Sequence, residues 1–168
     1  MRFLHCCVLL LSFMALVIAG CGGGGGGGGS SSPPTTKTAT LKLSTQNSID
    51  PAVLIYGFEL SLTLPSVASL PIDASGTPLQ EAVSSSGQFD GADFSIGSLY
   101  DNASHQLNVN YGSLVSHTLG EFITIVMTVP VSYEPNNNDI KNIILIAYGG
   151  PPGGNEIKEV TAKIESFN

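Results

Sequence analysis

Several short segments of this chain alternate strictly between apolar and polar residues, and this period of two limits the possible folds more than any other feature. The segment FELSLTL (58–64) alternates without an error, and four further segments follow the same pattern: TATLKLST (38–45), QLNVNYG (106–112), EFITIVMTV (121–129) and EVTAKIESF (159–167). Successive side chains of a β-strand point to opposite faces of its sheet. The alternation therefore predicts strands with one buried face and one face in water.

One segment, NIILIAYGG (142–150), is apolar on both faces, and we expect it to be a central strand that is covered on both sides. Turn-forming residues separate the strands at Asp101, at 134–139 and at 149–155, because Asn, Asp and Gly tolerate left-handed backbone and Pro cannot continue a sheet. Only TPLQEAVSSS (77–86) has the signals of a helical turn. These patterns predict an all-β chain, either a β-sandwich or a jelly roll, with at most one short helix.

The N-terminus has the order of residues that is typical of an export signal. Arg2 is followed by an apolar stretch over residues 3–19, which corresponds to a charged n-region and a hydrophobic h-region. The rival interpretation is a transmembrane helix. It is disfavoured because glycines follow the stretch and no charged residue occurs before Lys37 to anchor it at an interface. We therefore expect residues 1–20 to be a signal peptide.

The end of this leader reads VIAGC (17–21) and resembles the bacterial lipobox, in which small residues precede a cysteine that takes up a diacylglycerol as a thioether. The resemblance implies cleavage between Gly20 and Cys21 and a lipid anchor on Cys21, whose acyl chains, such as palmitate, contribute about 0.8 kcal/mol per buried CH₂. Gly22 stands where an aspartate would retain a Gram-negative lipoprotein at the inner membrane, so in such a cell the resemblance implies the outer membrane. The alternative is an ordinary signal peptide with a chance cysteine.

Residues 21–38 are expected to be a flexible tether. Glycines fill positions 22–29, and serines, prolines and threonines follow, so the segment cannot bury apolar surface. A coil of this composition spans roughly 20–25 Å, at about 5–6 Å × √n. Residues 39–168 are then long enough for one globular domain. Because Cys6 and Cys7 leave with the leader, the mature chain is expected to have no disulfide.

The charge of the chain excludes some classes of partner. Charged residues make up 11% of the 168 residues, against about 25% in an average soluble domain. The net charge is −7, and the lysines are scattered. An acidic chain without a basic patch repels phosphate backbones, so nucleic acid is excluded as a partner. The same charge gives no attraction to anionic lipid, so membrane attachment must be hydrophobic.

The order of the segments after the tether resembles the cohesin-like domains of bacterial surface and cellulosome proteins. ATLKLST (39–45) is followed by YGFELSLTLPSVASLP (56–71), the helical excursion, the hairpin FSIGSLYDNASHQLNVNYG (94–112) and GEFITIVMTVP (120–130). The resemblance covers nearly all of residues 39–168. It implies a jelly-roll sandwich of about nine strands, related in shape to some carbohydrate-binding modules, that binds a dockerin-like partner through one sheet face. The sequence shows one such unit without a repeat or an attached enzyme, so a dockerin is not a required partner.

The sequence holds no recognisable catalytic or metal site. Ser113 and His117 lie in YGSLVSHTLG, which lacks the strand–elbow–helix context of a nucleophilic serine. His117 and His105 lie near expected turns, where we predict solvated imidazoles. Asp90 and Asp93 lack the five or six ligands in register that a calcium loop needs, so the interpretation of FDGADF as a turn is favoured. We expect no enzyme activity, no cofactor and no metal.

The aromatic residues set limits on sugar binding. The chain has no Trp and five Tyr, which excludes a flat tryptophan strip for crystalline polysaccharide. Tyr111 and Tyr148 fall in apolar strands and are expected in the core. Tyr56, Tyr100 and Tyr133 are left as the only candidates for exposed ligand-contact platforms, which would allow weak glycan binding.

Three functions remain open at this stage. The leading hypothesis is a non-catalytic, lipid-anchored binding module of the cell envelope that presents one sheet face to an extracytoplasmic protein, and it predicts an exposed apolar patch on that face. The second is a glycan-binding domain at the cell surface, with a groove lined by tyrosines. The third is a structural envelope lipoprotein, with an exposed strand edge competent for pairing.

Overall fold

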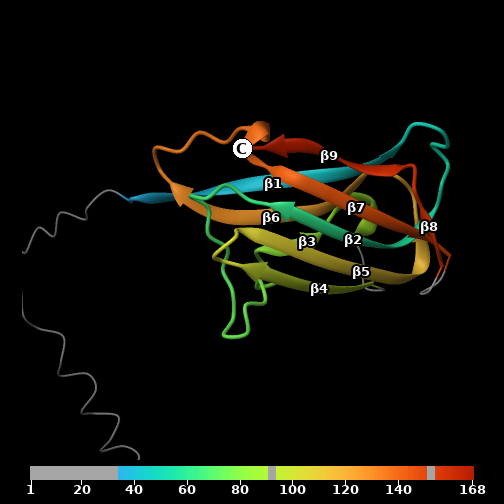
Figure 1. Cartoon of the computed structure of the whole chain (residues 1–168), viewed down its shortest axis with the longest axis horizontal. Helices are drawn as coiled ribbons and strands as arrows, with labels where there is room; N and C mark the ends of the chain where they lie inside the picture. The colour runs from blue at the N-terminus through green and yellow to red at the C-terminus, as the bar shows by residue number, and fades with distance from the viewer. Residues whose placement is uncertain (1–33, 91–93, 151–153) are drawn as a thin grey trace, which may run out of the picture. The chain divides into compact units, whose positions relative to one another are not determined.

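The computed structural model describes residues 34–90, 94–150 and 154–168, and these residues form two antiparallel β-sheets that pack against each other as a sandwich (Figure 1). One sheet has four strands in the order β3-β6-β1-β9, and the other has five strands in the order β4-β5-β2-β7-β8. All the strand pairs that the structure describes are antiparallel. The leader, Cys21 and the glycine run lie outside the described residues.

The nine strands confirm the all-β class and the sandwich architecture. Their bounds are β1 Thr36–Asn47, β2 Ile55–Thr63, β3 Val83–Ser85, β4 Phe94–Asp101, β5 Gln106–His117, β6 Glu121–Pro130, β7 Lys141–Gly149, β8 Asn155–Ile157 and β9 Val160–Phe167. Two short 3₁₀ turns, η1 (Gly87–Phe89) and η2 (Asn137–Asp139), complete the described elements. The described residues contain no helix with the length and hydropathy of a membrane span.

The alternating segments place their apolar residues between the two sheets, as the period of two predicts. Leu41, Leu62, Leu107 and Ile125 are fully buried. Burial of one such side chain contributes about 1.5–3 kcal/mol to the free energy of unfolding. Removal of apolar surface from water between the sheets is therefore the main force that holds the sandwich together.

Aromatic rings fill one part of this core. Phe58 stacks on Tyr111 with ring centroids 4.9 Å apart, and it meets Phe122 edge to face at 4.8 Å. Phe122 enters the core because β6 has a bulge opposite β1. Leu43 of β1 pairs with Ile123, and Ser44 pairs with Glu121, so Phe122 is the extra residue of β6. A bulge adds one residue to a strand and redirects its side chain. Alternation alone would have placed Phe122 on the outer face.

The structure contradicts the expectation that residues 142–150 form a strand covered on both faces. β7 pairs with β2, and beyond it lies only β8, which has three residues. Ala147 is fully buried, and Leu145 packs against the core. Ile144 points to the other side and is 58% exposed. The side chains of β7 still alternate between the faces, and its apolar outer residues are in contact with water.

The expected helical turn at 77–86 is present over one turn only. The amides of Ala82 and Val83 both donate to the carbonyl of Leu79, at 2.8 and 3.2 Å. The chain then extends into β3, which pairs with β6. Pairing with a neighbouring strand overrides the weak local preference for helix. By contrast, the expected hairpin at 94–112 is confirmed as the β4–β5 pair.

Candidate functional site

The outer face of the five-stranded sheet carries regular cross-strand rows of side chains. In the first row Leu99 of β4, Asn108 of β5, Ser61 of β2 and Ile144 of β7 lie opposite one another. In the second row the corresponding residues are Gly97, Asn110, Glu59 and Ile146. We call these eight residues the amide–aliphatic face, because amide and aliphatic side chains predominate in it.

The middle of the amide–aliphatic face is hollowed. Six of its residues (Glu59, Ser61, Asn108, Asn110, Ile144 and Ile146), together with Leu60, line a shallow depression of about 120 Å³. Pockets that enclose drug-sized ligands have volumes of about 300–1,000 Å³, so this depression can receive one protruding side chain or sugar ring but cannot enclose a ligand. Leu99 at one end of the row and Ile144 at the other are 54% and 58% exposed.

The face ends in two carboxylates beside a tyrosine. The hydroxyl of Tyr148 donates to Glu59 Oε1 at 2.9 Å, and Glu156 of β8 lies directly opposite Tyr148 in the register. The hydrogen bond to Glu59 raises the pKa of Tyr148, and desolvation and the charges of Glu59 and Glu156 raise it further. The ion pairs among the described residues do not include Glu59 or Glu156. This end of the face therefore favours a positively charged group on any molecule that binds there.

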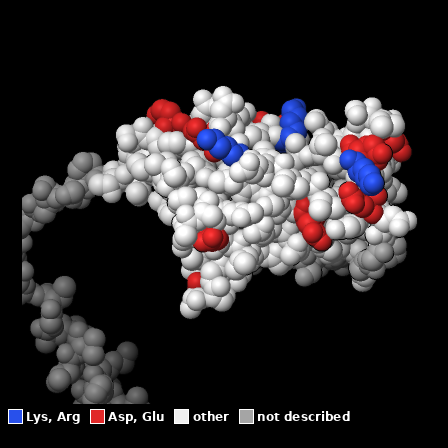
Figure 2. Space-filling view, in the orientation of Figure 1, with Lys and Arg blue, Asp and Glu red and all other residues white. Residues whose placement is uncertain are grey.

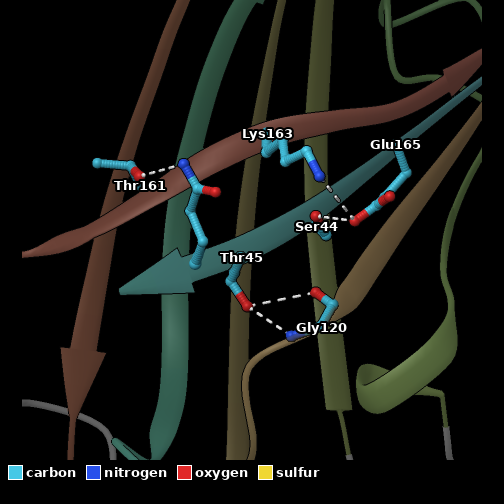
Figure 3. Close-up of polar contacts among 7 residues, drawn as sticks. Ser44, Thr45, Gly120, Thr161, Lys163 and Glu165 are labelled. Carbon is cyan, nitrogen blue, oxygen red and sulfur yellow. Dashed lines mark hydrogen bonds and ion pairs between the residues drawn. The ribbon is translucent and has the colours of Figure 1, made fainter. Parts of the chain in front are cut away.

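The outer face of the four-stranded sheet carries charges that are paired within the chain. Lys42 of β1 forms a two-point contact with Glu121 of β6, with Nζ 3.0 and 3.2 Å from the two carboxylate oxygens. Ser44 donates to Glu165 at 2.6 Å, and Lys163 lies 4.0 Å from the same oxygen (Figure 3). Burial raises the pKa of Glu121, but hydrogen bonds from Lys42 and Ser86 and the charge of Lys42 outweigh it and hold this pKa below its usual value.

A β-bulge explains how Glu165 reaches Ser44. Lys42 pairs with Ser166 and Leu43 pairs with Ile164, so Glu165 is the extra residue of β9. Further along β1, the hydroxyl of Thr45 accepts from the amide of Gly120 at 3.0 Å and donates to its carbonyl at 3.3 Å (Figure 3). These contacts tie β1 to β9 and to the β5–β6 turn. In the view of Figure 2 the charged side chains are few and lie in small groups, with wide uncharged areas between the groups.

The structure corrects the expectation that His117 is a solvated imidazole. Its Nδ1 donates to the backbone carbonyl of Gln88 at 2.8 Å, and its Nε2 lies 2.8 Å from the hydroxyl of Tyr111. The ring also stacks on Phe89, with centroids 4.7 Å apart. His117 thus closes one end of the aromatic core. The partner carbonyl lies 29 residues earlier in the chain, which no local sequence signal could show.

Ser113 lies next to His117, but its hydroxyl is buried and is not accessible to a substrate. Its Oγ lies 3.1 Å from His117 Nε2, yet Ser113 is only 2% exposed and its Oγ accepts the amide proton of Val115. A nucleophile must be reachable by its substrate, and this hydroxyl is enclosed. The other histidine, His105, lies in the β4–β5 turn with a positive φ of 56°, and its Nδ1 is 3.1 Å from the hydroxyl of Tyr100.

The candidate tyrosines are distributed differently from the expectation. Tyr100 is 3% exposed because it pairs with Leu107 on the inner face, so the expectation that its ring is exposed is wrong. Tyr133 is half-buried and donates to Asp139 at 2.8 Å; burial and this bond raise its pKa to about 12. Tyr56 is half-buried as well. Tyr111 is buried as expected, whereas Tyr148 lies on the outer face, contrary to the expectation that it is in the core.

The aspartates considered as calcium ligands or turn residues lie at turns where the structure describes them. Asp101 accepts from the amide of Ala103 and from the hydroxyl of Ser104, and the Ser104 bond contributes most to lowering the pKa of Asp101. This confirms the expected turn at Asp101. Asp90 follows η1 as its C-cap, and Asp93 lies outside the described residues. Among the residues that the structure describes, no three His, Cys, Asp or Glu side chains come together as a metal site would require.

No protein-family model matches this chain, and no curated protein matches it. A chain in the crystal structure of a type II cohesin–X-dockerin complex from Acetivibrio cellulolyticus, an N-terminal interface mutant, is similar to this chain in structure. The match has 8% sequence identity and a TM-score of 0.47, and it covers 74% of this chain and 83% of the other.

Sequence reasoning missed the amide–aliphatic face as a site. The alternation did predict that Glu59 and Ser61 face water, and the paired strand QLNVNYG did the same for Asn108 and Asn110. The signal that could have located the face is the apolar outer side of 142–150, which taken alone predicts burial. In a sheet whose other strands have polar outer residues, an apolar strand can form an exposed binding surface as well as a covered one.

Proposed function

We propose that this protein is a non-catalytic, lipid-anchored binding module of the cohesin-like type, which holds an extracytoplasmic protein partner on the amide–aliphatic face. The observation that supports this most directly is Ile144, a large aliphatic side chain that is 58% exposed at one end of a cross-strand row of the amide–aliphatic face. The adjacent Ile146 and the depression between the strands extend this apolar surface. Exposed apolar surface rimmed by polar groups is typical of protein-binding sites.

The composition of the face favours a partner of particular chemistry. An apolar side chain of the partner would enter the depression beside Ile144. Asn108 and Asn110 would exchange hydrogen bonds with polar groups around it, because an amide both donates and accepts. A lysine or arginine of the partner would meet Glu59 and Glu156. A dockerin-like protein is the specific partner that the sequence resemblance implies.

The anchor follows from the sequence of the leader. VIAGC (17–21) would be cleaved before Cys21, and the acylated cysteine would hold the domain at the cell envelope, in the outer membrane where the cell is Gram-negative. Two or three acyl chains give stable attachment without help from charge. Mass spectrometry of the native protein tests this step: an acylated Cys21 at the N-terminus supports it, and an unmodified thiol contradicts it.

The binding step is tested by quantitative capture from envelope extract. We expect the wild-type chain to enrich a protein that Ile144→Asp enriches at least tenfold less, because a buried carboxylate in the depression opposes an apolar anchor. Thr161→Asp is the matched control, since Thr161 is exposed on β9 of the opposite sheet. Equal capture by both variants would contradict the proposed face.

A glycan is the second candidate ligand, and the lining of the depression supports it. Ser61, Asn108, Asn110 and Glu59 can bind hydroxyl groups, while Ile144 and Ile146 can cover the apolar face of one sugar ring. Retention of the wild-type chain on insoluble polysaccharide, with loss in Asn108→Ala, would favour the glycan over the protein partner.

A further inference from the structure

A second large aliphatic side chain is exposed on the outer side of the five-stranded sheet, beyond the amide–aliphatic face. Leu114 of β5 is 78% exposed, the largest value among the large apolar side chains of the described residues. Asn108 and Asn110 of the same strand point outward, whereas Ser113 is buried. Because alternate residues of a strand point to the same side, Gly112 and Leu114 continue the outward row that the two asparagines begin.

Leu114 and Ile144 are far enough apart to be separate contacts of one partner. Gly112 pairs with Gly57 of β2, which pairs with Tyr148 of β7. Leu114 therefore lies two strands from Ile144 across the sheet and three outward positions further along it. At about 4.8 Å between strands and about 6.8 Å between outward positions, their Cα atoms are about 22 Å apart. A standard interface, with about 800 Å² on each partner, is wide enough to cover both.

A carboxylate without a cation lies between the two aliphatic side chains. Glu59 is on β2, the strand between β5 and β7, and it is near the midpoint of the line from Leu114 to Ile144. Lys158 follows β8, but the ion pairs among the described residues do not join it to Glu59 or to Glu156. A positive charge on a bound molecule would compensate Glu59 at this point.

We propose, on the basis of the proposed function, that Ile144 and Leu114 are two anchors of one interface. Its occupant is a folded protein that presents two apolar side chains about 22 Å apart, with a lysine or arginine between them. Each apolar side chain would remove one exposed aliphatic residue from water, and the charge over Glu59 would fix the orientation. A folded protein holds this spacing without the ordering cost that a flexible peptide would incur.

Reciprocal photo-crosslinking of the full chain in intact cells tests whether the two anchors belong to one interface. A benzophenone side chain at Asn108 reports contacts at the depression. One at Gly112 reports contacts beside Leu114, and a Cβ there would have nothing within 4 Å. We expect the same protein to crosslink at both positions. Leu114→Ser should weaken the crosslink at position 108 at least fivefold, and Ile144→Ser should weaken the one at position 112 to the same extent.

Val131→Ser is the matched control for the loss of an exposed aliphatic side chain. Val131 is 47% exposed and follows β6 of the four-stranded sheet. Its amide donates to the carbonyl of Thr35, so it lies at the end of the sandwich where β1 begins. This variant should leave both crosslinks within twofold of the wild type. Thermal melts verify that all three variants fold.

The outcomes separate this inference from the proposed function. A crosslink at position 108 that is lost in Ile144→Ser but unchanged in Leu114→Ser would overturn the second anchor and leave the proposed function in place. Different proteins at positions 108 and 112 would overturn it in the same way. No crosslinked protein at either position, as expected for a glycan ligand, would contradict both.

The charge between the anchors is tested by salt. Capture of the crosslinked protein by the wild-type chain should weaken more steeply with ionic strength than capture by Glu59→Gln, because salt screens a charge pair that the variant lacks. Equal salt dependence of the two chains would overturn the basic side chain assigned to the partner.

Discussion

The outer faces of the two sheets come from the same alternating sequence pattern but leave different surfaces. On the four-stranded sheet Lys42 pairs with Glu121, and Ser44 with Glu165, so its central charges already have partners. On the five-stranded sheet Ile144 is exposed at one end of its cross-strand row, and Glu59 has no cation among the described ion pairs. Alternation decides which residues face outward. The residues on neighbouring strands decide whether the outward side chains find partners within the chain or are left available to bind another molecule.

The largest predicted effect is on the free energy of unfolding, and it distinguishes a core residue from a residue of the outer face. Leu60 is 2% exposed between the outward residues of β2, and Leu60→Ala should lower the free energy of unfolding by about 2–5 kcal/mol because it leaves a cavity. Ile144→Ser should change it by less than about 0.5 kcal/mol, since Ile144 is on the surface. Urea denaturation measures both. A loss above about 2 kcal/mol for Ile144→Ser would show that the aliphatic surface is part of the core.

The next prediction compares one hydrogen-bonded glutamate from each face. Glu165→Ala leaves the hydroxyl of Ser44, which is 4% exposed, without its acceptor, and this should cost about 1–2 kcal/mol. Glu59→Ala removes the acceptor of the solvent-exposed hydrogen bond from Tyr148 and should cost clearly less, because water can replace the lost acceptor. Glu165→Gln keeps an acceptor and is the control. Equal losses for the two alanine variants would remove the distinction between the faces.

A smaller effect concerns the acid stability of the four-stranded face. The pKa of Glu121 is lowered in the folded chain, so its contribution is present above the unfolded value near 4.5 and is lost as the pH falls through the folded value. Both side chains of the pair are partly exposed, so solvent screens the interaction and this contribution is about 0.5 kcal/mol or less. Glu121→Gln should therefore weaken the fall in stability below about pH 4.5. An unchanged pH profile would show that the Lys42 contact contributes nothing.

The smallest effect concerns the phenol on the five-stranded face. Glu59 and Glu156 raise the pKa of Tyr148, so Glu59→Gln should lower this pKa toward the usual value of 10.0. Glu156→Gln should lower it less, because Glu156 acts through charge alone, whereas Glu59 also accepts the hydrogen bond. Titration of the tyrosine ring carbons by NMR measures both shifts. An unaltered pKa in Glu59→Gln would contradict the acidic end of the amide–aliphatic face.

The period of two was sufficient to predict most of the long strands and most of their inward residues, but not the short strands β3 and β8. It failed where a bulge or a long-range partner intervened. Phe122 is inside because β6 carries an extra residue, and His117 is ordered by a carbonyl 29 residues away. Neither feature leaves a local signal in the sequence.

The errors at Tyr100 and Tyr148 have a different cause. Tyr100 is a candidate for an exposed ring from the sequence, but the hairpin register sets it against inward Leu107. Tyr148 was assigned to the core because its neighbours are apolar, although Ala147 faces inward and the next residue must then face outward. Once one inward residue of a strand is known, counting alternate positions from it predicts which other side chains face inward. This count is a better guide than the hydrophobicity of the neighbouring residues.

Site-specific photo-crosslinking in intact cells tests the central claim most directly. A benzophenone side chain at Asn108 would report contacts on the amide–aliphatic face, and one at Thr161 would report contacts on the opposite sheet. We expect one crosslinked protein species at position 108, lost in combination with Ile144→Asp, and none of that species at position 161. The same species at both positions, or at position 161 alone, would contradict the assignment of function to the five-stranded sheet.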